Sequence, residues 1–384
     1  MLRVRHGFVV LTIAALGQPL RQESPDRNFL EEWLTTSGQA AIRWSLHIAP
    51  VRLGESQRLQ TSIRADIGAG ELLGRRMSFL VEIRDRDNRT YRSRTFSEKA
   101  GSSHLTLIQP LCIVPGDYQV TAAVYDAGSK EHNLKQANLR VPGFHQDPLP
   151  GVWHDLPAVE FSRCDSARLS LPLQTRKPVR IEIVVNESAN RNGLGGVIPR
   201  LEVLSNLMIP NGSMGVTMLD LEHRKVAFSQ ELVKKLDRRS VRAAWRDNKP
   251  LEIDAQSLAH YKDDAQFFLS EIGQRLEPQN TGAERVLIIM SAPQTFPQGE
   301  DLTPIRAAPQ PGSRVFYIRC RRVVYAFQFP SMGFSARPRR LRSDPNADSL
   351  EQTLRPLHPR LFDVTTPTQF RKALGAILSE VSQI

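Results

Sequence analysis

The sequence predicts a two-domain protein, with an all-β immunoglobulin-like sandwich followed by an α/β domain of the doubly wound kind. Two observations carry this prediction, a change of pattern along the chain and a Pro-rich segment where the change occurs. Apolar and polar residues alternate from about Trp44 to Val141, whereas apolar runs of strand length alternate with helical patterns beyond about residue 175. Between these regions, residues 142–157 contain four prolines, which interrupt both kinds of periodicity and mark a domain boundary.

The first domain is expected to span residues 18–143, with a short helix near Asn28–Leu34 packed on it. Its short strands are separated by turn signals such as Asp87-Asn88 and Pro115-Gly116-Asp117, as a sandwich requires when each sheet buries one face. A domain of this type serves either as a binding module or as a spacer, and the sequence leaves both readings open. The candidate strands are residues 45–52, 57–67, 77–84, 90–97, 104–113, 117–125 and 133–141.

A Pro-rich linker is expected over residues 144–174, and the α/β domain over residues 175–384. Within the second domain, residues 334–349 are rich in Arg, Pro, Ser and Asp and predict a surface loop insertion. This loop either contacts a partner or is a tolerated insertion.

The α/β prediction rests on buried strands, such as Val179–Val185 and Arg285–Met290, that alternate with helical patterns. One of these patterns predicts a basic helix at Ser229–Arg238. The last helix opens with Thr366-Pro367-Thr368-Gln369, a capping box with proline at its first position. Alternation of this kind favours a mostly parallel sheet that is covered on both faces.

The N-terminus has the features of a secretory signal peptide over residues 1–17. A basic start precedes an apolar run from Phe8 to Leu16, and Ala15 and Gly17 stand where signal peptidase reads small residues. The run is shorter than the roughly 20 residues that span a bilayer. We therefore expect an exported protein, periplasmic or secreted, without stable membrane insertion after cleavage.

The net charge of +11 is concentrated in short runs such as residues 319–322 and 337–342. Such runs suit contact with a polyanion or an acidic membrane, or they are solvated surface charge on a basic exported protein. No motif for nucleic-acid recognition accompanies them in the sequence, so nucleic acid is not an expected partner.

Three cysteines are too few for a disulfide scaffold, and an odd number leaves at least one unpaired. Cys112, Cys164 and Cys320 are therefore either core residues or contribute one bridge, and pairing of Cys112 with Cys164 is left open. The sequence has no Cys-x-x-Cys, HExxH or Cys/His cluster that indicates zinc.

Residues from about 175 onwards resemble a von Willebrand factor A domain, and the whole layout is similar to exported "VWFA-related" proteins of Acidobacteria. The resemblance rests on VRIEIVVNESAN (179–190), RVLIIMSAPQ (285–294) and LFDVTTPTQFRKALGAIL (361–378), in this order. It implies a Rossmann-like fold with a metal-ion-dependent adhesion turn after the first strand, where oxygen ligands hold a divalent cation that a partner's acidic side chain completes.

The metal turn of the family maps here onto Asn186, Ser188 and Asn190, and its later acid falls on Ala292. The threonine of the family's middle loop has only Ser257 as a candidate. Two carboxylates are thus replaced, and neutral oxygens alone compensate poorly for the dehydration of Mg²⁺. We interpret the turn as a vestigial site without a cofactor, the alternative being weak Mg²⁺ binding.

Signals for catalysis are weak. No nucleophile signature precedes a helix, Cys320 has no identifiable histidine partner, and Gly193–Gly196 lacks the spacing of a phosphate-binding turn. We therefore expect a non-enzymatic protein-binding or scaffold protein. The alternatives are a Mg²⁺-dependent adhesin and, less favoured, an enzyme that uses the Gly193–Gly196 turn.

Overall fold

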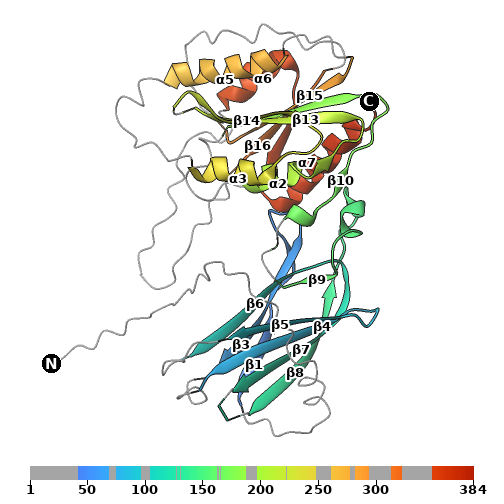
Figure 1. Cartoon of the computed structure of the whole chain (residues 1–384), viewed down its shortest axis with the longest axis vertical. Helices are drawn as coiled ribbons and strands as arrows, with labels where there is room; N and C mark the ends of the chain where they lie inside the picture. The colour runs from blue at the N-terminus through green and yellow to red at the C-terminus, as the bar shows by residue number, and fades with distance from the viewer. Residues whose placement is uncertain are drawn as a thin grey trace, which may run out of the picture.

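The computed structural model shows two bodies stacked along the long axis of the molecule (Figure 1). A β-sandwich forms one end, and a second sheet with helices forms the other. The predicted signal peptide and the helix near Asn28–Leu34 lie outside the described residues. The structure describes residues 42–68, 75–96, 104–126, 128–129, 131–161, 164, 166–186, 197–221, 223–247, 261–276, 282–293, 313–321 and 348–384.

The sandwich is immunoglobulin-like and consists of two antiparallel sheets. Alternate residues of their inner faces form a single core that includes Phe79, Val120 and Leu111. The first sheet has the order β1 (Trp44–Ile48), β3 (Leu59–Ile67), β6 (Leu105–Ile113) and β9 (Val159–Glu160), with β2 (Arg52–Leu53) beside β3. The second has the order β5 (Thr90–Phe96), β4 (Met77–Arg84), β7 (Gly116–Asp126) and β8 (His132–Val141). The period-two pattern of the sequence is thus realised as one buried face per sheet.

The second body is built on a six-stranded mixed sheet. Its order is β14 (Lys225–Val233), β13 (Gly212–Asp220), β11 (Val179–Asn186), β15 (Glu284–Ser291), β16 (Arg314–Cys320) and β17 (Arg360–Val364). All neighbouring pairs are parallel except β13 with β14, which is antiparallel. A small parallel pair, β10 (Leu171–Pro172) with β12 (Leu207–Met208), lies outside this sheet.

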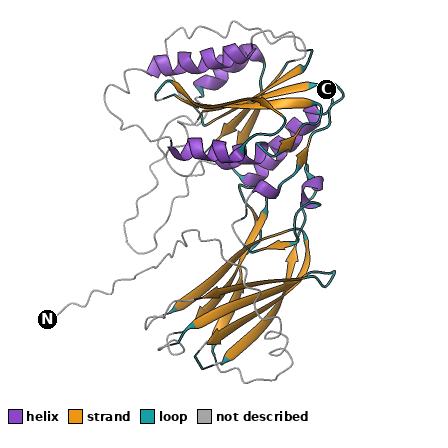
Figure 2. Cartoon of the chain, in the orientation of Figure 1, coloured by secondary structure: helices purple, strands orange, loops and turns teal. Residues whose placement is uncertain are grey.

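Helices lie on both faces of this sheet (Figure 2). On the face toward the sandwich are α2 (Val197–Leu204), α3 (Arg238–Asp247) and α7 (Pro367–Val381). On the other face are α5 (Tyr261–Leu276) and α6 (Ser349–Leu354). Single turns of 3-10 helix occur at η2 (Pro150–Trp153), η3 (Ser166–Arg168) and η5 (Arg355–Leu357). None of the helices within the described residues is long and apolar enough to cross a membrane.

The predicted fold class needs correction. The part of the chain that the structure describes is 47% strand and 23% helix, in several sheets with few helices, so it is mainly β and is not classed as a doubly wound α/β protein. The first half of the expected basic helix at Ser229–Arg238 belongs to strand β14, which runs antiparallel beside β13, and the helix begins only at Arg238. The segment Gln230-Glu231-Leu232 consists of helix formers, but hydrogen bonding to β13 overrides this local propensity.

The capping box of the last helix is present as predicted. The Thr366 hydroxyl accepts a hydrogen bond from the Gln369 amide, and the Gln369 side chain accepts from the Thr366 amide. Pro367 occupies the first turn, where its missing N–H has no intrahelical partner to lose. These contacts fix where α7 begins, and so they place Phe370 and Arg371 on its buried side.

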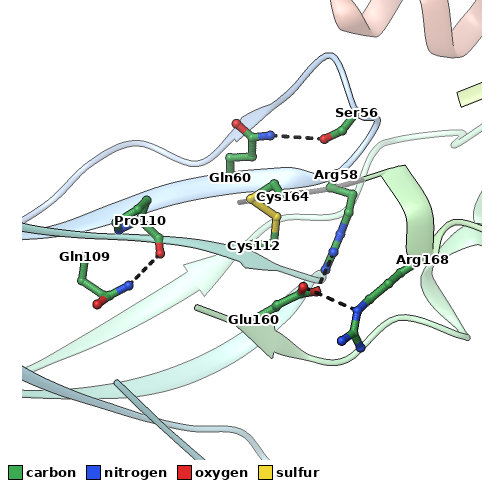
Figure 3. Close-up of a disulfide and its surroundings, with 9 residues drawn as sticks. All are labelled: Ser56, Arg58, Gln60, Gln109, Pro110, Cys112, Glu160, Cys164 and Arg168. Atoms are coloured by element: carbon green, nitrogen blue, oxygen red, sulfur yellow. Dashed lines mark hydrogen bonds and ion pairs between the residues drawn. A yellow bond between two sulfur atoms is a disulfide. The ribbon is translucent and has the colours of Figure 1, made fainter. Parts of the chain in front are cut away.

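The cysteines contribute one disulfide bridge, which was one of the two alternatives that the sequence left open. Cys112 of β6 is bonded to Cys164 (Figure 3). Their Cα atoms lie 5.6 Å apart, and Cys320 is buried and free. The bridge closes a loop with a sequence separation of 52. Under the chain-entropy model such a loop stabilises the fold by roughly 4 kcal/mol.

The Pro-rich segment is held on α7 by Arg371. The Arg371 guanidinium is buried and donates to both carboxylate oxygens of Asp147, at 2.7 and 2.8 Å, and to the Leu149 carbonyl at 2.9 Å. The Arg371 Cζ also lies 4.6 Å from the ring centroid of Trp153 and 5.3 Å from that of Phe144. The segment that was expected to be a linker is therefore a packed part of the junction between the two bodies.

The turn between β2 and β3 makes a second contact between the bodies. Gln57 Nε2 donates to the Pro367 carbonyl at 3.0 Å, and Arg200 Nε of α2 donates to Glu55 at 3.2 Å. The Arg200 side chain is almost fully buried. Together with the Arg371 contact, these bonds attach the sandwich to both α2 and α7.

We predict that Arg371→Ala lowers the free energy of unfolding by about 3–5 kcal/mol, because Asp147 is left as a buried carboxylate without its counter-charge. Arg371→Lys should be intermediate, since an ammonium cannot form the two-pronged contact. Urea denaturation followed by tryptophan fluorescence measures both. The control is Lys372→Ala at the exposed neighbouring position. A loss in Arg371→Ala no larger than that in Lys372→Ala would contradict the role given to this contact.

Candidate functional site

The predicted metal turn begins at the carboxyl end of β11. Asn186 is the last residue of this strand and is fully buried. Its Nδ2 donates to Ser291 Oγ at 3.0 Å, and Ser291 Oγ donates to the Ala292 carbonyl at 2.7 Å. The amide therefore joins the ends of two adjacent parallel strands. Ser188, Asn190, Ser257 and Gly193–Gly196 lie outside the described residues.

An acid that the sequence analysis missed ends the adjacent strand. Asp220 ends β13, fully buried, and its neighbour Leu219 is in register with Asn186. The Asp220 carboxylate accepts from the His223 amide at 3.4 Å, lies 2.5 Å from His223 Nδ1 and lies 3.9 Å from Lys225 Nζ. The available signal was an acid directly after a buried apolar strand, with a histidine three residues later.

The carboxyl ends of β11 and β15 thus bring together one amide and one hydroxyl, whereas Asp220 at the end of β13 alternates with Leu219 and Leu221 and belongs to the opposite face of the sheet. Ligands of parallel sheets commonly bind beyond this edge, where neighbouring connections diverge. Asp220 already has His223 and Lys225 as neighbours, and the Asn186 and Ser291 side chains contribute no charge. Within the described residues, no group of three His, Cys, Asp or Glu side chains is placed to hold a metal ion. The arrangement suits neutral hydrogen bonding better than coordination of a hard dication.

A second charged cluster lies further along the same sheet, around Arg319 of β16. Its buried guanidinium donates to both oxygens of Asp363, at 2.5 and 2.7 Å, and to Glu351 at 2.7 Å. Asp348 lies 3.4 Å away and accepts from the Tyr317 hydroxyl at 3.0 Å. These bonds join β16, β17 and α6, and their geometry is that of a structural network.

The electrostatics of this cluster agree with a structural role. Hydrogen bonds from Arg319 hold the pKa of the Asp363 carboxyl below its ordinary value, and the same bonds raise the pKa of Arg319. Burial raises the pKa of the neighbouring Cys320 thiol, which disfavours the thiolate. Cys320 is therefore poorly suited to act as a nucleophile.

Comparisons with known proteins give no family for this chain. No family model matches, and no curated protein matches. Among solved structures, the chicken interferon gamma receptor alpha chain is 16% identical over 26% of this chain and 50% of its own, with a TM-score of 0.18. AggA, the major subunit of Escherichia coli aggregative adherence fimbriae type I, is 10% identical over 27% of this chain and 95% of its own, with a TM-score of 0.17.

A glycosyl hydrolase family 2 member from Bacteroides cellulosilyticus is 8% identical over 87% of this chain and 40% of its own, with a TM-score of 0.20. Scores this low carry no argument about the fold or the function of this chain. The likeness to von Willebrand A domains therefore stays a prediction made from the sequence.

We predict that the native protein binds Mg²⁺ weakly or not at all, because Asn186 and Ala292 stand where carboxylates would be needed. Asn186→Asp combined with Ala292→Asp places two acids at adjacent strand ends, where the reduced dielectric strengthens their attraction for a dication. Calorimetric titration should show binding by the double variant only, and added Mg²⁺ should raise only its melting temperature. Asn138→Asp, at an exposed position of the sandwich, is the control. Tight binding by the native protein would contradict the interpretation.

The lowered pKa of Asp363 gives a pH-dependent prediction. A carboxyl with a depressed folded-state pKa stabilises the protein above its unfolded-state pKa, near 3.8, and this stabilisation is lost as the pH falls through the folded-state value. Asp363→Asn should cost roughly 1 kcal/mol at neutral pH, a figure discounted for the half-exposed carboxylate. The difference from the native protein should shrink below about pH 4. Exposed Asp87→Asn is the control, and a pH-independent difference would count against the ion pair.

Proposed function

We propose that this protein is an exported, non-enzymatic binding or scaffold protein, whose C-terminal body presents the binding surface and whose sandwich acts as its support. The junction carries this proposal. The buried arginines Arg371 and Arg200 tie the Pro-rich segment to α7 and the sandwich to α2 through ion pairs, so the two bodies are suited to act as one rigid unit. A rigid support limits the entropy lost when a partner binds, which favours affinity.

The disulfide supports the exported location. Cys112 and Cys164 are bonded, and disulfides persist in oxidising compartments but are rare where glutathione keeps thiols reduced. The bridge joins β6 to the segment that follows β9, next to the ion pair of Arg58 with Glu160 at 2.7 Å (Figure 3). An oxidising environment would thus stabilise the side of the sandwich that faces the junction.

The proposed contact does not depend on a metal ion. The side chains of Asn186 and Ser291 are neutral and are hydrogen-bonded to each other. The alternative of a Mg²⁺-dependent adhesin would need a carboxylate on their face of the sheet, whereas Asp220 on the neighbouring strand belongs to the opposite face. Removal of divalent cations distinguishes the two functions.

The test is capture of partners by the mature protein from envelope extract of its source, with and without EDTA. The candidate surface is tested by Val226→Glu, a change at an exposed apolar residue of β14 near the carboxyl edge of the sheet. The matched control is Ile108→Glu, at an exposed apolar residue of the sandwich.

We expect Val226→Glu to abolish capture of a specific partner, while EDTA and Ile108→Glu leave it unchanged. Loss of capture in EDTA would favour the adhesin. Equal capture by both variants would show that this surface is not used, and absence of any specific partner would remove the binding function.

A further inference from the structure

The segment from Lys234 to Arg246 has an unusual concentration of positive charge. It reads KKLDRRSVRAAWR, and Asp237 is its only acid. Groups of four to eight such residues on an amphipathic helix are typical of surfaces that contact anionic lipids. The basic residues are Lys234, Lys235, Arg238, Arg239, Arg242 and Arg246.

The fold presents much of this charge to solvent. Leu236 and Val241 are buried and anchor the start of α3 in the core, whereas Lys234, Lys235 and Arg239 are exposed. Figure 1 shows α3 on the same face of the sheet as α2 and α7. Arg239 is therefore carried by a packed helix, and Lys234 and Lys235 lie directly before that helix, next to the buried Leu236.

Local hydrogen bonds hold the segment in place. The Asp237 carboxylate accepts from the Arg239 amide at 3.0 Å and from Ser240 Oγ at 2.6 Å, so it is used to begin the helix. Arg242 Nη2 donates to Glu202 at 2.8 Å. Lys234 Nζ donates to the Pro210 carbonyl at 3.2 Å, a contact that leaves its charge uncompensated. Even with Asp237 and Glu202 both counted, the charge of this surface remains clearly positive.

A large aromatic side chain accompanies the charge. Trp245, one turn beyond Arg242 on α3, is 42% exposed. Tryptophan beside lysine and arginine is typical of the membrane interface, where the indole lies at headgroup level and the cations contact phosphates. A platform for nucleic-acid bases would be expected to offer more than one aromatic ring, and a protein interface a larger apolar centre.

From this combination, we infer that residues 234–246 form a peripheral contact site for a bilayer rich in anionic phospholipid. The exposed lysines and Arg239 supply the attraction to headgroup phosphates, and Trp245 enters the interface. The contact is superficial, in keeping with the expectation that the mature protein has no stable membrane insertion. It would concentrate a scaffold protein at an envelope membrane.

The experiment is co-sedimentation of the full mature protein with vesicles of phosphatidylcholine alone or mixed with phosphatidylglycerol. Lys235→Glu combined with Arg239→Glu should weaken binding to the anionic vesicles at least roughly tenfold, since each cation near such a surface contributes about 1 kcal/mol. Trp245→Ala should weaken binding to the anionic vesicles less than this double variant does. It should also change the salt dependence of binding less. Binding should fall as salt is raised.

The matched control is Arg89→Glu combined with Arg140→Glu, which changes the net charge equally at exposed positions of the sandwich. Circular dichroism and melting temperature confirm that each variant is folded. The inference is overturned if the native protein ignores anionic vesicles, if the control loses as much binding as the Lys235/Arg239 variant, or if duplex DNA or polyglutamate competes the protein off the vesicles at equal charge concentration.

Discussion

The Arg371 guanidinium, buried between the Pro-rich segment and α7, constrains the rest of the architecture. A charge in this position is costly unless an opposite charge and good hydrogen bonds accompany it, and Asp147 supplies both. Burial works to raise the pKa of Asp147, but bonds from Arg371, Leu149 and Trp153 hold it below the ordinary value. The carboxylate is therefore ionised at neutral pH. The two hydrogen bonds between Arg371 and Asp147 allow few relative positions of these side chains, so they restrict how the sandwich is oriented relative to the second body.

Packing around this ion pair adds to the constraint. A side chain at Gly375 would bring its Cβ within 2.4 Å of Pro148 Cβ, so α7 and the Pro-rich segment lie as close as glycine permits. Arg371 Nη1 and Arg58 Nη2 have no hydrogen-bond partner among the residues that the structure describes. Such a junction sacrifices some stability relative to an apolar one, and its directional bonds favour a single arrangement of the two bodies. That property suits a support that holds a binding surface and a basic helix in fixed relative positions.

Local patterns predicted the parts of the fold that depend on local rules. Alternation of apolar and polar residues located the sandwich strands, because in a strand with one buried face every second residue is apolar. The capping box located the start of α7. The pattern failed over the first half of Ser229–Arg238, where the helix formers Gln230-Glu231-Leu232 lie in an edge strand that ends at Val233. The edge position explains this failure, since an edge strand buries too little to impose an apolar pattern of its own.

The site and the junction depend on contacts that are distant in sequence. Asn186 was singled out, but its partner Ser291 lies 105 residues away, and Asp147 lies 224 residues from Arg371. Hydrophobic periodicity reports only on local structure and cannot predict contacts between residues so far apart in the sequence. Asp220 was overlooked because one acid after a strand is common and gains meaning only when pairing places its strand next to that of Asn186. The sequence therefore indicated that the metal turn lacks acids, but not which neighbouring groups surround it.

The most direct test of a junction that holds the two bodies as one unit is the distance between them in solution. Spin labels at Arg140→Cys in the sandwich and Lys225→Cys beside β14 are both at exposed positions, while Cys320 is buried and Cys112 is bonded to Cys164. Pulsed electron spin resonance should give one narrow distance distribution, and this distribution should broaden in the Arg371→Ala background. A broad or multi-peaked distribution in the otherwise native protein would show that the bodies move independently and would contradict the account.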